Sequence, residues 1–274
     1  MGEPVNLNGK GRRRAWRPGL AIWLSAGFHV AALIILLARP QWWTSILTAL
    51  VLNHVVLALI GLWPRSRLLG ANMLRLPDAA AKRNEIALTF DDGPDPDVTP
   101  KVLDILDSHH AKASFFVIGD KAAAHPELIR EIVKRGHSIE NHSLKHSSFF
   151  GFFAWTALRK DIGTAQEIIL GITGQAPAFF RSPMGIRNPL LDPVISRLGL
   201  RYVTWTRRGF DTVTVDPAIV LARLARKMSA GDILLLHDRR THGQRAIVLE
   251  VLPALLDRIA AAGLKSVSLP LAMQ

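Results

Sequence analysis

The stretch ALTFDDGPDPD, residues 87–97, joins an apolar run to two adjacent carboxylates and a Gly-Pro turn. Asp91 and Asp92 close the apolar run, which is rich in residues that favour β-strands. Because adjacent side chains on an extended chain point in opposite directions, we expect the two carboxylates to divide their roles. One can bind a metal ion while the other handles a proton. Two Asp residues before Gly-Pro are also ordinary turn chemistry, so the rest of the chain must decide between these interpretations.

The chain from residue 81 to residue 274 alternates short apolar runs with amphipathic runs. Strands that alternate with helices predict parallel β/α units. Seven candidate strands favour an α/β fold, an irregular parallel (β/α)7-type barrel. A doubly wound sheet is the alternative, although no G-x-G-x-x-G follows the first strand. The predicted strands are residues 86–90, 113–118, 138–141, 178–181, 202–205, 233–237 and 265–269, and the predicted helices are residues 100–109, 127–135, 158–170, 217–230 and 244–262.

Polar side chains fall at the carboxyl ends of these strands. Asp91 and Asp92 end the first strand, His142 follows the third, and Arg181 ends the fourth. Asp211 comes after the fifth strand, and His237 closes the sixth. Since active sites of parallel β/α barrels are built at the carboxyl ends of the strands, we expect these side chains to converge on one face.

The segment ENHSLKH, residues 140–146, carries His142 and His146 at a spacing of four. On a helical turn this spacing brings two imidazoles to the same side. Two imidazoles and one carboxylate form a three-ligand metal site with positions left for water and substrate. Two histidines on an exposed turn are the ordinary alternative, but the nearby Asp-Asp strand end favours a metal site. The chain has no cysteine, which excludes disulfides, Cys-ligated zinc and thiol nucleophiles.

Five motifs, taken in order, resemble those of the polysaccharide deacetylases, carbohydrate esterase family 4. The resemblance covers roughly residues 85–269 and implies hydrolysis of the N-acyl group, acetyl above all, of an amino sugar. It also implies a divalent metal cofactor, with Zn2+ favoured and Co2+, Ni2+ or Fe2+ as alternatives. The motifs are TFDDGP (89–94), HSLKH (142–146), RSPMG (181–185), FD (210–211) and LLLH (234–237).

The resemblance implies a role for each matching residue. Asp211 beside His237 would favour the imidazolium form that a general acid requires. The implied roles are metal ligation by Asp92, His142 and His146, base catalysis by Asp91, acid catalysis by His237, positioning of the base by Arg181 and of the acid by Asp211, contact with the acetyl methyl by Leu235, and stabilisation of the oxyanion by the backbone N–H of Met184.

Two motifs depart from the family pattern. Family members usually carry an aromatic residue where Met184 stands. Their fourth motif usually reads D-x-x-D-W; here Arg208 replaces its first Asp and Thr212 replaces its Trp. These changes concern the substrate groove, because the expected ligands, base and acid are all present.

Residues 1–80 form a separate region with a basic leader and two stretches without charge, residues 18–38 and 41–64. Each has about the 20 residues that a membrane-spanning helix needs, so we expect a transmembrane helical hairpin. One span with an interfacial or core-packed helix is the alternative. His29, Asn53 and His54 lie within these stretches, and we expect them at a helix–helix contact rather than in a functional site.

Positive residues flank the hairpin unevenly. Five Lys or Arg residues precede the first stretch and three follow the second before residue 80, whereas only Arg39 lies between them. The positive-inside rule therefore predicts a multi-pass protein of a bacterial-type inner membrane with its catalytic domain in the cytoplasm.

Arginines near the predicted site bear on the substrate. Arg207 and Arg208 precede Asp211, and Arg239, Arg240 and Arg245 follow His237. We expect this cluster, with Arg239 and Arg240 as substrate-binding residues, to bind the phosphate of a polyprenyl-linked amino sugar, since guanidinium groups suit such oxyanions. Solvated loop charges are the alternative. The net charge of +12 is not accompanied by a basic helix or an aromatic platform, so no nucleic-acid partner is expected.

The leading hypothesis is thus a metal-dependent N-deacetylase that acts on a lipid-linked or oligosaccharide amino sugar at the membrane. An extracytoplasmic peptidoglycan or exopolysaccharide deacetylase is the second hypothesis, and it requires the reverse topology. The third is a noncatalytic, membrane-tethered sugar-binding protein.

Overall fold

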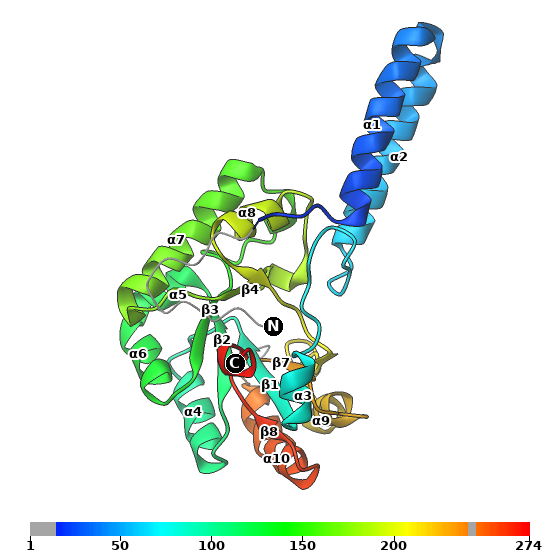
Figure 1. Cartoon of the computed structure of the whole chain (residues 1–274). Helices are drawn as coiled ribbons and strands as arrows, with labels where there is room; N and C mark the ends of the chain where they lie inside the picture. The colour runs from blue at the N-terminus through cyan, green and yellow to red at the C-terminus, as the bar shows by residue number, and fades with distance from the viewer. Residues whose placement is uncertain (1–14, 241–244) are drawn as a thin grey trace.

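The computed structural model describes residues 15–240 and 245–274. The leader residues Lys10, Arg12, Arg13 and Arg14, and the start of the helix predicted at 244–262, lie outside these ranges. An α/β domain holds most of the chain, and two long helices project from it side by side (Figure 1).

A parallel sheet forms the centre of the domain. Its strands follow the order β5-β4-β3-β2-β1-β7-β6, and β8 pairs with the beginning of β1. The strands are β1 (Glu85–Asp91), β2 (Ala113–Val117), β3 (Ser138–Asn141), β4 (Phe179–Phe180), β5 (Arg201–Tyr202), β6 (Arg207–Arg208), β7 (Ile233–His237) and β8 (Lys265–Ser266). All ladders between them are parallel, as the sequence predicts.

The sheet is a half-barrel rather than a closed barrel. Within the part of the chain that the structure describes, no strand ladder joins β5 to β6, the two ends of the strand order. The segment before β1 lies alongside this opening, where Met73 N donates to Tyr202 O at 3.1 Å and Leu76 N donates to Gly231 O at 2.8 Å. The seven-strand barrel prediction is therefore corrected in two respects. β6 is an additional strand, and the barrel stays open between β5 and β6, where Met73 and Arg75 make isolated bridges to Val203 and Asp232.

β1 is the central strand because its side chains are apolar on both faces. Residues from Ile86 to Phe90 are fully buried, as expected for a parallel strand that is covered on both sides. Its register places Asp91 level with His237 of β7 and with Phe116 of β2. Strand pairing alone therefore brings two of the predicted catalytic residues to the same end of the sheet.

Helices and short turns complete the domain. Their apolar faces pack on the sheet, and the largest cluster of buried side chains joins β1, β2 and β7 to α4, α9 and α10. The elements are α3 (Asp78–Lys82), α4 (Thr99–Ser108), α5 (Gly119–Ala124), α6 (Pro126–Lys134), η2 (Phe150–Phe152), α7 (Trp155–Thr173), η3 (Pro183–Gly185), α8 (Leu191–Arg197), α9 (Pro217–Ala225), α10 (Ile247–Ala261) and α11 (Leu269–Ala272).

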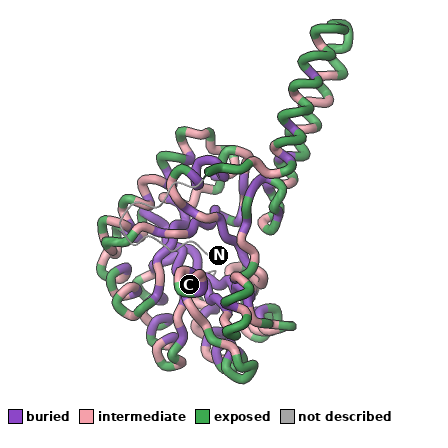
Figure 2. Tube along the Cα trace, in the orientation of Figure 1, coloured by how far each residue is buried: buried purple, intermediate pink, exposed green. Residues whose placement is uncertain are grey.

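The N-terminal hairpin consists of α1 (Leu20–Ala38), the turn η1 (Pro40–Trp42) and α2 (Trp43–Gly61). Both arms are long and apolar enough to cross a membrane, with mean hydropathies of 2.3 and 1.9. Figure 2 shows the hairpin exposed along most of its length, in contrast to the buried centre of the domain. Asn53 donates to Ser25 Oγ at 2.8 Å, and the rings of His29 and His54 lie 5.3 Å apart. These polar residues therefore lie at the contact between the two helices, as expected.

Candidate active site

A small cavity of about 110 Å³ opens at the carboxyl ends of the central strands. Its walls come from strands that are far apart in sequence, which is the arrangement that the polar strand ends predict. The lining residues are Asp91, Asp92, His142, His146, Met184, Gly185, Trp205, Arg208, Thr212, Leu235, His237 and Arg239.

Three side chains in this cavity form a candidate metal site. The Nε2 atoms of His142 and His146 lie 3.3 and 3.1 Å from Asp92 Oδ1, and one donor atom from each residue falls within 4.8 Å of the others. Asp92 Oδ1 is buried and accepts no hydrogen bond. Burial alone would raise the pKa of Asp92, but the three surrounding histidines hold it well below its usual value, so the carboxylate is ionised.

The orientation of His142 fits a bound cation. Its Nδ1 lies 2.8 Å from the carbonyl oxygen of Arg181, so this nitrogen donates and the Nε2 atom faces Asp92. Burial lowers the pKa of His142, but Asp91 and Asp92 outweigh that effect and raise it, which means that this face attracts positive charge. Carboxylate and imidazole donors of this kind suit a divalent transition metal such as Zn2+.

Local backbone geometry, rather than regular secondary structure, brings the ligands together. β1 ends at Asp91, and Asp92 adopts a φ of 72°, so both carboxylates turn into the same cavity instead of pointing in opposite directions. His142 and His146 lie in a loop after β3 and not on the expected helical turn. Ser143 and His146 have φ values of 70° and 51° there, and Ser143 Oγ accepts from His146 N at 3.0 Å.

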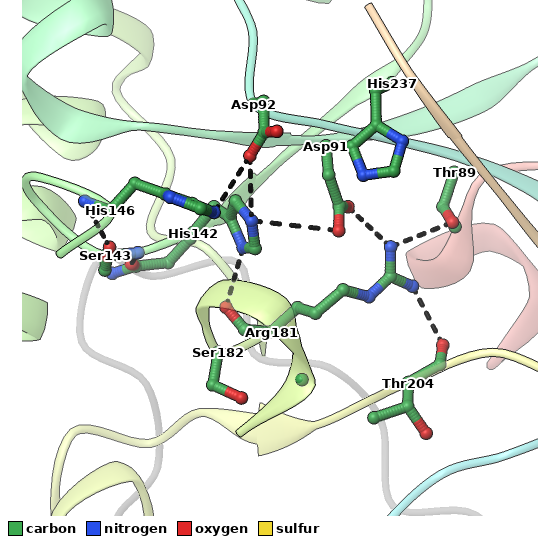
Figure 3. A network of polar contacts seen from close by, with 12 residues as sticks. Thr89, Asp91, Asp92, His142, Ser143, His146, Arg181, Ser182, Thr204 and His237 are labelled. Carbon is green, nitrogen blue, oxygen red and sulfur yellow. Dashed lines mark hydrogen bonds and ion pairs between the residues drawn. The ribbon is translucent and has the colours of Figure 1, made fainter. Parts of the chain in front are cut away.

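Arg181 holds Asp91 from beneath the cavity floor. The guanidinium group is fully buried and donates to Asp91 Oδ1 at 2.6 Å, to Thr89 Oγ1 at 3.0 Å and to the carbonyl oxygen of Thr204 at 2.9 Å (Figure 3). It also stacks 4.1 Å from the centre of the Phe116 ring. These contacts fix the guanidinium group and with it Asp91 Oδ1, while the second oxygen of Asp91 lies 3.8 Å from His142 Nε2.

Asp211 holds His237 on the other side of the cavity. One carboxylate oxygen lies 2.9 Å from His237 Nδ1, and the other accepts from His237 N at 2.8 Å. Burial lowers the pKa of His237, but Asp211, together with the nearby Asp92 and Asp91, outweighs that effect, so the net shift is upward. Asp211 is itself buried and does not line the cavity, which makes it a positioning residue.

Only two of the five arginines singled out in the sequence face the cavity. Arg239 Nε lies 2.9 Å from Asp92 Oδ2, and Arg208 stacks on Trp205 and Phe210 with its Nε buried and without a hydrogen bond. The other three do not line the cavity. Arg207 turns to the opposite end of the sheet and pairs with Asp232, Arg240 pairs with Asp97 outside the cavity, and Arg245 pairs with Glu250.

Met184 and Leu235 lie where the sequence places them, on the cavity wall. Met184 adopts a φ of 56° within η3, and its side chain is 43% exposed at the rim. Trp205 was not predicted as a site residue, although its place at the end of a predicted strand could have indicated it. Lys121 was also missed; it donates to the carbonyl oxygen of Asp92 at 2.7 Å.

Comparisons with known proteins show what the chain is similar to. The family model of the polysaccharide deacetylases matches residues 78–203. The chain is 33% identical to a peptidoglycan-N-acetylglucosamine deacetylase of Bacillus cereus, over 56% of this chain and 72% of that protein. It is also 33% identical to a chitooligosaccharide deacetylase of Bradyrhizobium, over 62% of this chain and 81% of that protein.

A solved structure is also similar. The structure is that of a family 4 carbohydrate esterase from Streptomyces lividans in complex with acetate, which matches with a TM-score of 0.62 and 30% sequence identity. The match covers 67% of this chain and 91% of the esterase chain. The fold and the site define a carbohydrate esterase of the half-barrel type. The chain belongs to the polysaccharide deacetylase family, carbohydrate esterase family 4.

Proposed function

We propose that this protein is a metal-dependent hydrolase that removes the N-acetyl group of a lipid-linked amino sugar. The observation that carries the proposal is the placement of Asp91 and His237 in one cavity with Asp92, His142 and His146. Each of the two proton-handling residues has a separate buried partner, Arg181 for the first and Asp211 for the second.

The chain's own residues account for the proton transfers. A divalent cation held by Asp92, His142 and His146 would polarise the amide carbonyl and acidify water. Asp91 takes a proton from the attacking water as the new C–O bond forms. His237 donates its proton to the sugar nitrogen as the C–N bond breaks, and the products are acetate and a free amine. Leu235 lies on the cavity wall, where it would contact the acetyl methyl.

Two variants test the reaction. Acetate release is measured on a panel of sugars that includes chitooligosaccharide and undecaprenyl-phosphate-linked N-acetylhexosamine. The metal content of each purified protein is measured alongside. We expect Asp91→Asn to lose roughly 10²–10⁴-fold in rate while still binding metal, because it lacks only the base. His142→Ala should lose both metal and activity. Tight metal binding by the wild type without turnover of any acetylated sugar would instead favour a noncatalytic sugar-binding protein.

Two arginines in the cavity support an anionic substrate. Arg208 and Arg239 line the cavity together with Thr212 and His237, and Arg208 has a buried Nε without a hydrogen bond. Arg208 stands where family members usually carry Asp, so the local charge is reversed. A phosphate next to the acetylated sugar would pair with such groups. This chemistry supports a polyprenyl-phosphate-linked amino sugar over a neutral oligosaccharide.

Arg208→Gln tests the phosphate. Arg239 is a poorer choice because it also contacts the metal ligand Asp92. We expect Arg208→Gln to raise KM for the phosphate-linked sugar roughly tenfold or more, as loss of a charge-assisted hydrogen bond would, and to change KM for chitooligosaccharide little. Arg240→Gln is the matched control, because Arg240 pairs with Asp97 outside the cavity. An equal effect of Arg208→Gln on both substrates would contradict the assignment of phosphate.

We also propose that α1 and α2 cross a bacterial-type inner membrane and leave the catalytic domain in the cytoplasm. The uneven distribution of Lys and Arg around the hairpin supports this orientation. A lipid-linked precursor is accessible on that side, whereas finished wall polymer is not.

A further inference from the structure

Exposed apolar side chains gather where the hairpin joins the domain. Leu62 and Trp63 directly follow α2 and are 57% and 63% exposed. Phe149 and Phe152 lie in the loop that contains η2 and are 70% and 87% exposed, and Leu190 before α8 is 41% exposed. Figure 1 shows α8 on the side of the domain from which the hairpin emerges.

The three segments are fixed to one another. Asn188 Nδ2 donates to the carbonyl oxygens of Gly151 and Phe153 at 3.1 and 2.9 Å, which ties the η2 loop to the segment before α8. Arg187 N donates to Gly61 O at 3.0 Å, which ties the same segment to the end of α2. Phe150 is buried beneath the loop, so its neighbours Phe149 and Phe152 are held outward by an anchored turn.

The rim of the catalytic cavity belongs to this same surface. Met184 and Gly185 line the cavity, and a Cβ on Gly185 would lie only 2.7 Å from Pro64 Cβ. The chain that leaves α2 therefore packs directly against the cavity wall. Arg65 and Arg67 are exposed beside Trp63, so positive charge borders the apolar side chains.

We propose that this surface, formed by Leu62, Trp63, Phe149, Phe152 and Leu190, rests on the bilayer, with Phe149 and Phe152 inserted among the headgroups. The bilayer is the partner favoured by continuity with α2, by the aromatic residues and by the neighbouring arginines, which suit anionic lipid. An exposed aromatic pair held rigidly is otherwise costly for a soluble surface. The inference rests on the hairpin crossing the membrane but not on the proposed reaction.

The consequence is that the cavity opens at the level of the lipid headgroups. A sugar attached to a membrane-embedded lipid would reach Met184 and the metal ligands without leaving the bilayer. A soluble sugar reaches the cavity from water, so the position of the cavity at the headgroup level would not help it to bind.

Site-directed spin labelling tests the contact, and the absence of native cysteine makes single-label variants direct to prepare. Phe152→Cys and Phe149→Cys are labelled in the full chain and placed in nanodiscs of phosphatidylcholine and phosphatidylglycerol. Leu271→Cys is the control, since Leu271 is 44% exposed on α11. We expect the ratio of oxygen to chromium-oxalate accessibility to be several-fold higher at positions 149 and 152 than at position 271. Equal, water-like ratios, or dipolar broadening that shows a second copy on the surface, would overturn the proposal.

A second readout separates this inference from the proposed function. Phe149→Ser with Phe152→Ser should lower the rate on phosphate-linked sugar embedded in vesicles several-fold and leave the rate on soluble chitooligosaccharide unchanged. If no substrate is turned over but the labels are shielded by lipid, the reaction fails and the membrane contact stands. Equal rates on embedded substrate for the double variant and the wild type would count against the contact.

Discussion

In the proposed reaction, Asp211 sets the acid character of His237. Its two oxygens bind the ring and the backbone N–H of the histidine, and it raises the pKa of His237 against the effect of burial. A general acid works only while it is protonated, so activity is lost as the pH rises through its pKa. A raised pKa therefore extends activity to higher pH.

The replacement Asp211→Asn tests this dependence. Without the carboxylate, the pKa of His237 falls, and we expect the alkaline limb of the kcat/KM profile to move to lower pH. The matched control is Asp216→Asn, an exposed N-cap of α9 whose side chain accepts from Ala218 N. If the alkaline limb of the kcat/KM profile stays at the same pH in Asp211→Asn, another group supplies the proton.

At the residue scale, the sequence could predict which side chains meet in the candidate site, but not the geometry in which they meet. Asp91, Asp92, His142 and His146 are identified by residue type and by their place after strands. The positive φ of Asp92, which turns both carboxylates into one cavity, leaves no signature in the sequence. The partners of Arg207 and Arg240 are likewise acidic residues, Asp232 and Asp97, that only the folded chain brings near.

At the scale of elements, the strands that were easiest to predict are those with continuous apolar runs. β1, β2 and β7 have five or more buried residues each, and their predicted bounds differ from the observed ones by one residue or less. β6 consists of Arg207 and Arg208 alone, so it has no apolar run to detect. The short strands β4 and β5 are defined by pairing with neighbours rather than by their own composition.

The contact between α2 and the segment after η3 is the element-scale feature that most directly links the N-terminal hairpin to the cavity. A Cβ on Gly61 would lie 2.1 Å from Arg187 O, a backbone atom that cannot yield as a side chain does. We expect Gly61→Ala to force the two segments apart at a cost of about 1–3 kcal/mol, as overpacking does. Thermal unfolding in detergent should then begin several degrees lower than in the wild type.

A matched control lies in the other arm of the hairpin. Gly27 of α1 has open space around the position of an added Cβ, so Gly27→Ala should not lower the unfolding temperature. If both variants unfold like the wild type, the contact at Gly61 does not hold the hairpin to the domain. A rise in KM in Gly61→Ala alone would further indicate that the displaced segment carries the Met184 rim with it.

At the scale of the whole molecule, the proposed membrane topology determines which sugars the cavity can meet. Under the proposed topology, its two arms return the chain to the side on which it started, so the domain lies in the same compartment as the segment before α1. Five positive residues precede α1, and Arg65, Arg67 and Arg75 follow α2, which favours the cytoplasmic side for both ends. A green fluorescent protein fused after Gln274 should therefore fluoresce, and an alkaline phosphatase fused at the same place should be inactive.

Deleting residues 41–64 supplies the control, because a single remaining span moves the C-terminus to the other side and should reverse both reporters. An active phosphatase on the full-length chain would place the cavity outside the cytoplasm. The peptidoglycan or exopolysaccharide hypothesis would then replace the lipid-linked one, since the same residues would face finished polymer. The reaction assigned to Asp91 and His237 would be unaffected, because it depends on the cavity and not on its compartment.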